Sequence, residues 1–324
     1  MENDSRFSDS HDGHSGRISL SRISYHGWPD SLLLSNGIVE VIIVPAIGRV
    51  MQLRFAGDEA GALWENGELL GQPLSAKATA DGWLNFGGDK AWPSPQSDWE
   101  KRTGRAWPPP ATFDSVPLQA TSEDSGVVLT SGVDPHFGIK VVRHVRLAPQ
   151  SSQLKITTEF QKVAGATVRI GVWIVTQVPE PERVFILLPE RSGFPGGFIQ
   201  QTGPPPKDLR HDGRLLSLNR DPSEYIKIGT EGTSLLWMDK RLALLVRAED
   251  TPGEYPNGGS RTEVYTNPDP YPYAELETEG PLVTLEAGAR TARTNTYTLF
   301  RRNTSDCLLE ARCLFALDGT SPRS

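Results

Sequence analysis

The chain has 324 residues, of which 33 are basic and 40 are acidic. Its formal net charge of -7 disfavours a broad nucleic-acid surface and a polybasic membrane surface, whereas small neutral partners remain open. Cys307 and Cys313 are its two cysteines, and no other Cys or His lies near them in sequence, so neither a disulfide framework nor a structural zinc site is predicted.

Residues 1–23 are polar, acidic and rich in serine, and they contain no apolar core of a secretory signal. We therefore expect a disordered leader on a cytoplasmic protein. The apolar runs further along are too short to cross a bilayer, so no membrane association is predicted. Residues 24–320 show no break in composition, and we expect them to form a single domain.

Short segments rich in β-branched residues follow one another, separated by Gly, Pro, Asp and Asn, with hardly any helical periodicity. This pattern predicts an all-β fold of two large stacked sheets. The expected strands are 37–45, 49–57, 125–133, 138–148, 152–163, 167–178, 183–189, 234–239, 242–248, 262–267, 271–281 and 293–303. Three irregular stretches, 81–113, 189–213 and 250–272, are expected loops, where binding residues usually lie.

The first loop places Trp83, Trp92, Trp99 and Trp107 in one segment with Asp89 and Lys90. Indole rings stack on the C–H faces of sugars, and charged neighbours bind hydroxyl groups, so the composition favours a carbohydrate site. We expect Asp89, Trp92 and Trp99 to bind substrate. The alternative is that the rings pack the loop onto the sheets.

The strand at 138–148 carries Arg143 on one face and His144 on the other. Arg143 is a candidate clamp for hydroxyl or carboxylate groups, or a member of an ordinary ion pair. His136 and His144 are candidate general acids, because the pKa of a free histidine is near neutral, although a single histidine on a strand is more often structural.

The third loop contains the turn Asn257-Gly-Gly, followed by a strand on which Glu263 and Tyr265 share a face. We expect Tyr255, Asn257 and Tyr265 to reach a ligand. A hairpin turn with no ligand contact is the alternative.

The strand at 271–281 places Glu275 and Glu277 on one face, with Cα atoms about 7 Å apart. Two desolvated carboxylates at that spacing perturb each other, so one is a candidate base and the other an orienting acceptor. A solvated strand face would carry glutamates equally well.

The segments 34–57, 63–66, 83–99, 143–147, 255–267 and 273–289, with "GGDKAWPSP" and "ELETEGP" as the most specific, resemble an uncharacterised bacterial domain family of the galactose mutarotase-like superfamily. The resemblance implies the β-supersandwich of aldose 1-epimerases. In those enzymes a late-strand glutamate takes the proton of the anomeric hydroxyl and a histidine protonates the ring oxygen. The resemblance makes Glu277, or failing it Glu275, the general base.

The histidine of that family should fall near 171–181, where this chain has Thr176 and Gln177. A neutral amide is not a catalytic acid, so Gln177 is expected to bind substrate, and Lys90 or a loop histidine such as His136 is expected to supply the proton.

We therefore expect a carbohydrate-active protein, most simply a mutarotase- or epimerase-like enzyme acting on a sugar or sugar derivative. The alternatives are a glycoside hydrolase or lyase using the same cleft, and a sugar-binding domain that has lost its general acid. No phosphate-loop or dinucleotide motif stands out, so no cofactor or metal is predicted. The expected partner is a small carbohydrate, bound by a monomer or homodimer.

Overall fold

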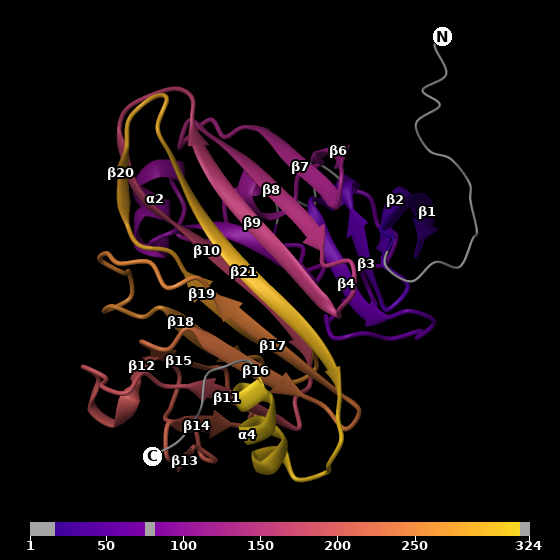
Figure 1. Cartoon of the computed structure of the whole chain (residues 1–324). Helices are drawn as coiled ribbons and strands as arrows, with labels where there is room; N and C mark the ends of the chain where they lie inside the picture. Colours follow the sequence, from indigo (N-terminus) through magenta and orange to yellow (C-terminus); the bar gives the residue numbers. More distant parts are fainter. Residues whose placement is uncertain (1–16, 75–81, 318–324) are drawn as a thin grey trace.

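The computed structural model describes residues 17–74 and 82–317, which form two large stacked β-sheets (Figure 1). All strand pairings in this part of the chain are antiparallel. The all-β, two-sheet prediction is therefore confirmed.

The first sheet has 11 strands, and its central strands form the floor of the site described below. Its order is β1 (Ser19–Tyr25), β2 (Trp28–Ser35), β3 (Val39–Val44), β4 (Arg49–Phe55), β5 (Asp89–Ser94), β10 (Val168–Pro179), β19 (Tyr273–Glu279), β18 (Thr262–Thr266), β15 (Ile226–Thr230) and β12 (Ile199–Thr202), with β20 (Val283–Leu285) paired to β10.

The second sheet has ten strands. Its order is β13 (Arg210–Asp212), β14 (Leu215–Leu218), β11 (Arg183–Leu187), β16 (Ser234–Met238), β17 (Leu242–Ala248), β21 (Arg290–Arg301), β9 (Gln153–Lys162), β8 (Ile139–Leu147), β7 (Gly126–Val133) and β6 (Gln119–Glu123). β8 and β9 form the hairpin that the sequence predicted.

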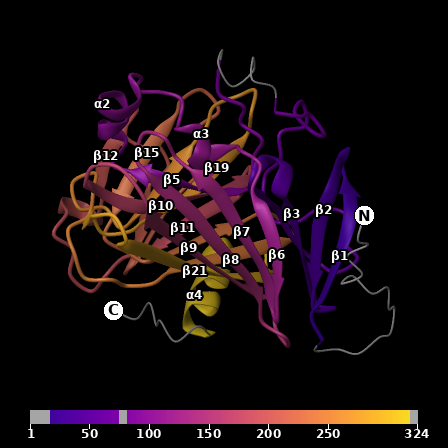
Figure 2. The same cartoon turned by 90° about the horizontal axis from the view of Figure 1, so that it is seen from above.

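The helices are short and lie outside the sheets. They are the α-helices α2 (Trp99–Thr103), α3 (Ala111–Asp114) and α4 (Cys307–Leu317) and the 3-10 helices η1 (Pro45–Ile47), η2 (Gln96–Asp98) and η3 (Pro195–Gly197). Figure 2 shows α2 and α3 beside the 11-stranded sheet and α4 on the opposite side of the molecule. None of the helices within 17–74 and 82–317 has the length and apolar character needed to span a membrane.

The main core fills the space between the sheets, because each strand places alternate side chains inward. On β8, Ile139, Val141 and Val145 are buried, whereas His144 and Arg146 are partly exposed on the other face. The alternation predicted for this strand is therefore observed.

The structure differs from the predicted elements in several places. The strands that were not predicted are β2, β6, β12, β13, β14 and β15, and β12 and β13 lie within the expected loop 189–213. Ser19–Ile23, expected in the leader, belong to β1, while residues 1–16 of that leader lie outside the described residues. The expected loop 81–113 contains β5, the short helices η2 and α2, and the start of α3. Helix α4 was not predicted, yet Ala311, Leu314 and Phe315 have helical spacing and pack on the outer face of the ten-stranded sheet.

Candidate functional site

A cleft of about 250 Å³ lies on the face of the 11-stranded sheet that points away from the ten-stranded sheet. Strands β5, β10, β19, β18 and β15 are adjacent there, so their outward side chains meet. The lining residues are Trp83, Trp92, Gln96, Trp107, Trp173, Thr202, Lys227, Tyr265, Asn267, Tyr273, Glu275 and Glu277.

Strand register brings the polar residues of the floor together. β19 pairs Glu275 with Gln177 of β10 and with Tyr265 of β18. Its next outward residue, Glu277, pairs with Glu263 of β18. The inward residues of β19, among them Leu276, pack in the core between the sheets. Strand β19 is therefore buried on both faces, which excludes the solvated strand face considered from the sequence.

Two glycines before β5 bring Lys90 into this floor. Gly87 and Gly88 have φ angles of 96° and 70°, a backbone region that favours glycine. A Cβ atom on Gly87 would lie 2.1 Å from the carbonyl oxygen of Trp64, so a larger residue cannot be accommodated there without a shift. The Gly-Gly pair therefore allows the chain to pass close to Trp64 as it enters β5.

Tryptophan side chains form the wall of the cleft. Trp92 makes edge contacts with Trp83, Trp107 and Trp173, at ring-centroid distances of 6.0, 5.9 and 5.0 Å. The indole N–H groups of Trp83 and Trp92 both donate to the carboxylate of Asp114, at 3.1 and 2.9 Å. These bonds fix the orientation of the two indole rings, so the aromatic wall is preorganised.

Asp114 is held in turn by a buried cation. The guanidinium of Arg49 donates to Asp114 Oδ1 at 2.9 Å and to the carbonyl oxygen of Gly87 at 2.8 Å. Both charged side chains are almost fully buried, so their ion pair offsets the desolvation of each.

A second cation, the partly buried Lys227, lies among the carboxylates of the floor. Its Nζ is 2.8 Å from Glu277 Oε2 and 2.6 Å from Glu263 Oε2. Trp173 Nε1 also donates to Glu277 Oε2, at 2.6 Å. Glu277 Oε1 is buried and has no hydrogen-bond partner among the described residues, so its capacity to accept a hydrogen bond or a proton is unused.

Burial governs the protonation of these groups. It raises the pKa of Glu277 to about 8, against the opposing effect of Lys227. It also raises the pKa of Glu275, against the effects of Lys90 and Lys227, and it raises that of Glu279 well above the usual range. For Lys227 the carboxylates outweigh burial and raise the pKa, so this side chain stays charged.

Lys90 lies beneath the aromatic wall and does not line the cleft. Its ammonium group is 5.1 Å from the ring centroid of Trp92 and 5.8 Å from that of Trp83. It donates to Gln177 Oε1 at 2.7 Å, and Gln177 Nε2 donates to Glu275 Oε1 at 2.9 Å. Burial, with Arg49 acting in the same direction, lowers the pKa of Lys90 to about 8.

Two predicted site residues, Asp89 and Arg143, do not face the cleft. They form an ion pair on the opposite face of β5, where Asp89 also accepts hydrogen bonds from Thr176 and Tyr297, each at 2.6 Å. The prediction that Arg143 lines the cleft is therefore wrong. Inward alternation on β8 places it between the sheets, and its role there is structural.

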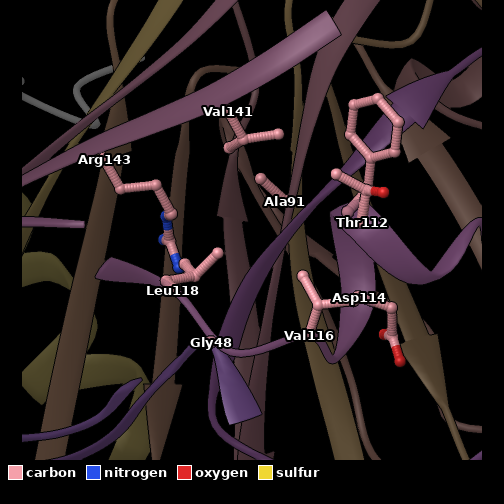
Figure 3. Close-up of a pocket in the computed structure, with 9 residues that line it drawn as sticks. Gly48, Ala91, Thr112, Asp114, Val116, Leu118, Val141 and Arg143 are labelled. Atoms are coloured by element: carbon pink, nitrogen blue, oxygen red, sulfur yellow. The ribbon is translucent and has the colours of Figure 1, made fainter. Parts of the chain in front are cut away.

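A separate cavity of about 10 Å³ lies beside Arg143, as Figure 3 shows. Ala91 lines it from the face of β5 opposite Trp92. In Figure 3 the carboxylate of Asp114 points away from this cavity. The volume is enough for about one water molecule, so this cavity is not a sugar site.

Gln177 is fully buried, and neither it nor four further predicted residues line the cleft. Trp99 is fully buried and donates to the carbonyl oxygen of Pro93, so it holds the loop on the sheet instead of contacting a ligand. The hydroxyl of Tyr255 donates to the carbonyl oxygen of Thr251 at 2.6 Å.

Asn257 donates to Glu263 at 2.8 Å and to Glu279 at 3.3 Å, so it orients two carboxylates on the same face of the sheet as Glu277. The backbone N–H of His136 is bound by Asp134 in a turn next to β8. None of the described histidines is among the residues that line the cleft.

Sequence reasoning missed Trp173 and Lys227, which both line the cleft. Period-two alternation from Gln177 leads to Trp173, so this residue could have been found. The same alternation had placed Tyr273 on the face of Glu275 and Glu277, where it lines the cleft with them. Lys227 lies on a strand that was not predicted, and its place beside β18 depends on a long-range pairing.

Comparisons with known proteins agree with this architecture. Residues 30–300 match the model of a family described as "Domain of unknown function (DUF4380)". No curated protein matches the chain. Among solved structures, a galactose mutarotase-like protein from Lactobacillus casei is 11% identical, with a TM-score of 0.57, over 83% of this chain and 100% of that one.

A galactose mutarotase-like protein from Clostridium acetobutylicum is 10% identical, with a TM-score of 0.56, over 88% of this chain and 99% of that one. A putative aldose 1-epimerase from Escherichia coli K12 is 13% identical, with a TM-score of 0.52, over 88% of this chain and 100% of that one. At these identities the comparisons establish the galactose mutarotase-like fold.

Proposed function

The chain belongs to the DUF4380 family and has the galactose mutarotase-like fold, and we propose that it binds a sugar in the cleft and interconverts its anomers. One observation carries the proposal. Glu275 and Glu277 lie side by side on the floor of a tryptophan-walled cleft, and burial raises the pKa of both.

Glu277 is the base in this proposal. Trp173 and Lys227 hold its Oε2, so its unpartnered Oε1 can take the proton of the anomeric hydroxyl. A pKa of about 8 places the group close to neutral pH, where a carboxyl group can both accept and return a proton.

Glu275 is the acid, in place of the expected Lys90. Lys90 is sealed beneath the tryptophans, whereas Glu275 lines the cleft and also has a raised pKa. Because Lys90 donates to the oxygen of Gln177, the amide nitrogen of Gln177 must face Glu275 Oε1. The proton of neutral Glu275 then resides on Oε2.

The reaction balances with these two groups alone. Glu277 removes the proton from the anomeric oxygen, which becomes the carbonyl oxygen of the open chain. The bond between C1 and the ring oxygen breaks, its electron pair stays on the ring oxygen, and Glu275 delivers a proton there. Rotation about the C1–C2 bond followed by the reverse steps gives the other anomer.

A sugar-binding domain without catalysis is the second candidate. The observation that favours it is Gln177, an amide at the position where the related epimerases are expected to have a histidine. In this case Glu275 and Glu277 would accept hydrogen bonds from sugar hydroxyl groups.

The test begins with a thermal-shift screen of reducing sugars, because a bound ligand raises the apparent stability. Anomer exchange of the sugars that bind is then followed by NMR. We expect the protein to exchange the anomers faster than buffer alone does. The Glu275→Gln variant should lose this acceleration. Binding without any acceleration would reject catalysis and support the binding domain, and release of a new reducing sugar from a glycoside would indicate a hydrolase.

A further inference from the structure

A second hollow, of about 350 Å³, adjoins the cleft. Trp83, Asn267 and Tyr273 line both spaces, so these three side chains form a common wall. The remaining lining residues of the second hollow are Asn66, Glu68, Leu69, Leu84, Asn85 and Tyr271. The two spaces therefore form one elongated depression with two lobes.

The chemistry of the second hollow suits a neutral, hydroxyl-rich ligand. Asn66, Asn85 and Asn267 contribute side-chain amides, and Glu68 is the single charged residue of its lining. The side chain of Asn85 is hydrogen-bonded to Tyr273, yet its Oδ1 is buried without a hydrogen-bond partner among the described residues. A buried acceptor of this kind costs stability unless a ligand or water supplies a donor.

Hydrogen bonds connect residues that line the second hollow in the absence of a ligand. The hydroxyl of Tyr271 donates to Glu68 at 2.8 Å, which joins two loops that both line the hollow. Asn267 Nδ2 donates to the carbonyl oxygen of Tyr271 at 2.9 Å, and Asn267 Oδ1 accepts from Tyr265 at 2.9 Å. Binding would therefore need little ordering of these side chains.

We propose that this hollow is a second sugar-binding subsite and that the ligand is a reducing oligosaccharide. The inference rests on the proposed function, which requires a free hemiacetal over Glu277. Since a linear oligosaccharide has a hemiacetal at its reducing end alone, that ring occupies the cleft. The next sugar ring then lies on the other side of the common wall, in the second hollow, beside Asn85 and Tyr271.

The test compares each monosaccharide with disaccharides that carry it at the reducing end. Glucose is compared with cellobiose, maltose and lactose, xylose with xylobiose, and galactose with galactobiose, by isothermal titration calorimetry on the full chain. We expect at least one disaccharide to bind about tenfold or more tightly than its monosaccharide, the gain expected from one or two added hydrogen bonds with ring stacking.

Tyr271→Ala separates the two lobes, because Tyr271 lines the hollow and not the cleft and is 37% exposed. We expect it to remove most of the disaccharide gain and to leave monosaccharide affinity unchanged. Leu309→Ala, an exposed position on α4 beside the other sheet, is the matched control and should change neither.

The subsite is rejected if no disaccharide gains affinity over its monosaccharide, or if Tyr271→Ala weakens both equally. A different result would show that the proposed catalytic function is wrong. Normal anomer exchange in Glu277→Gln would reject the catalytic assignment, while a disaccharide gain that depends on Tyr271 would still support the subsite. If none of the sugars binds, both the proposed function and the proposed subsite are rejected.

Discussion

Replacing Glu277 by Gln preserves the shape of this side chain but removes its ability to take a proton. The amide oxygen can still accept hydrogen bonds from Trp173 and Lys227, so the cleft should keep its form. We expect the rate of anomer exchange to fall about 10²- to 10⁴-fold, the usual contribution of a general base, with sugar affinity nearly unchanged.

The pH dependence of the wild-type protein gives a second measure of the same group. With a pKa of about 8, roughly a tenth of Glu277 is ionised at pH 7 and about half at pH 8. The value of kcat/KM should therefore rise about tenfold per pH unit below pH 7 and roughly fivefold between pH 7 and pH 8.

The assay follows a pure anomer by polarimetry or NMR in a weakly catalytic buffer, with affinity measured separately by calorimetry. Glu279→Gln is the matched control, because Glu279 lies on the same face of β19, does not line the cleft and has a strongly raised pKa, so the change leaves charge and shape nearly the same. Wild-type exchange in Glu277→Gln, or exchange independent of pH between 6 and 8, would refute the assignment.

Three other outcomes are expected. Lys227→Met leaves buried carboxylates without their cation, so urea unfolding should show that the free energy of unfolding falls by about 3–5 kcal/mol. The pH optimum of anomer exchange should also move upward. Lys207→Met is the control, because it removes an exposed ion pair and should lower the free energy of unfolding by less than about 1 kcal/mol. Because burial raises the pKa of Glu277, the folded protein holds a proton that the unfolded chain releases. The free energy of unfolding should therefore fall by about 1.4 kcal/mol per pH unit as the pH rises from about 5 to 8, and a melting temperature that rises across this range would contradict the sign. Trp107→Ala, at an exposed edge of the cleft, should weaken sugar binding roughly 3- to 10-fold in calorimetry without lowering the melting temperature, and equal affinity would remove Trp107 from the site.

The sequence was informative wherever a local period decided the structure. The strand containing Glu275 and Glu277 and the alternation around Arg143 were predicted because side chains alternate with period two. Which face of a strand lies against the core could not be predicted in this way, because it depends on pairing between strands that are distant in the sequence. Arg143 was therefore placed in the cleft although it lies between the sheets.

The floor of the cleft could be predicted only in part for the same reason. Glu277 was identified from its own strand, but its cation, Lys227, comes from a strand 50 residues earlier in the chain. Lys90 was expected in the open site, whereas the packing of Trp83 and Trp92 over it could not be read from the sequence. Burial, which sets the protonation of these groups, is a property of the assembled sheet.

The neighbours Asp89 and Lys90 point to opposite faces of β5, one into the network between the sheets and the other into the floor of the cleft. Insertion or deletion of one residue in this strand would exchange the two, placing an ammonium group against Arg143 and a carboxylate beneath the tryptophans. Homologous chains should therefore vary in length within the surrounding loops but not between Gly88 and Trp92. The alternation of side chains along β5 therefore constrains the core and the cleft at the same time.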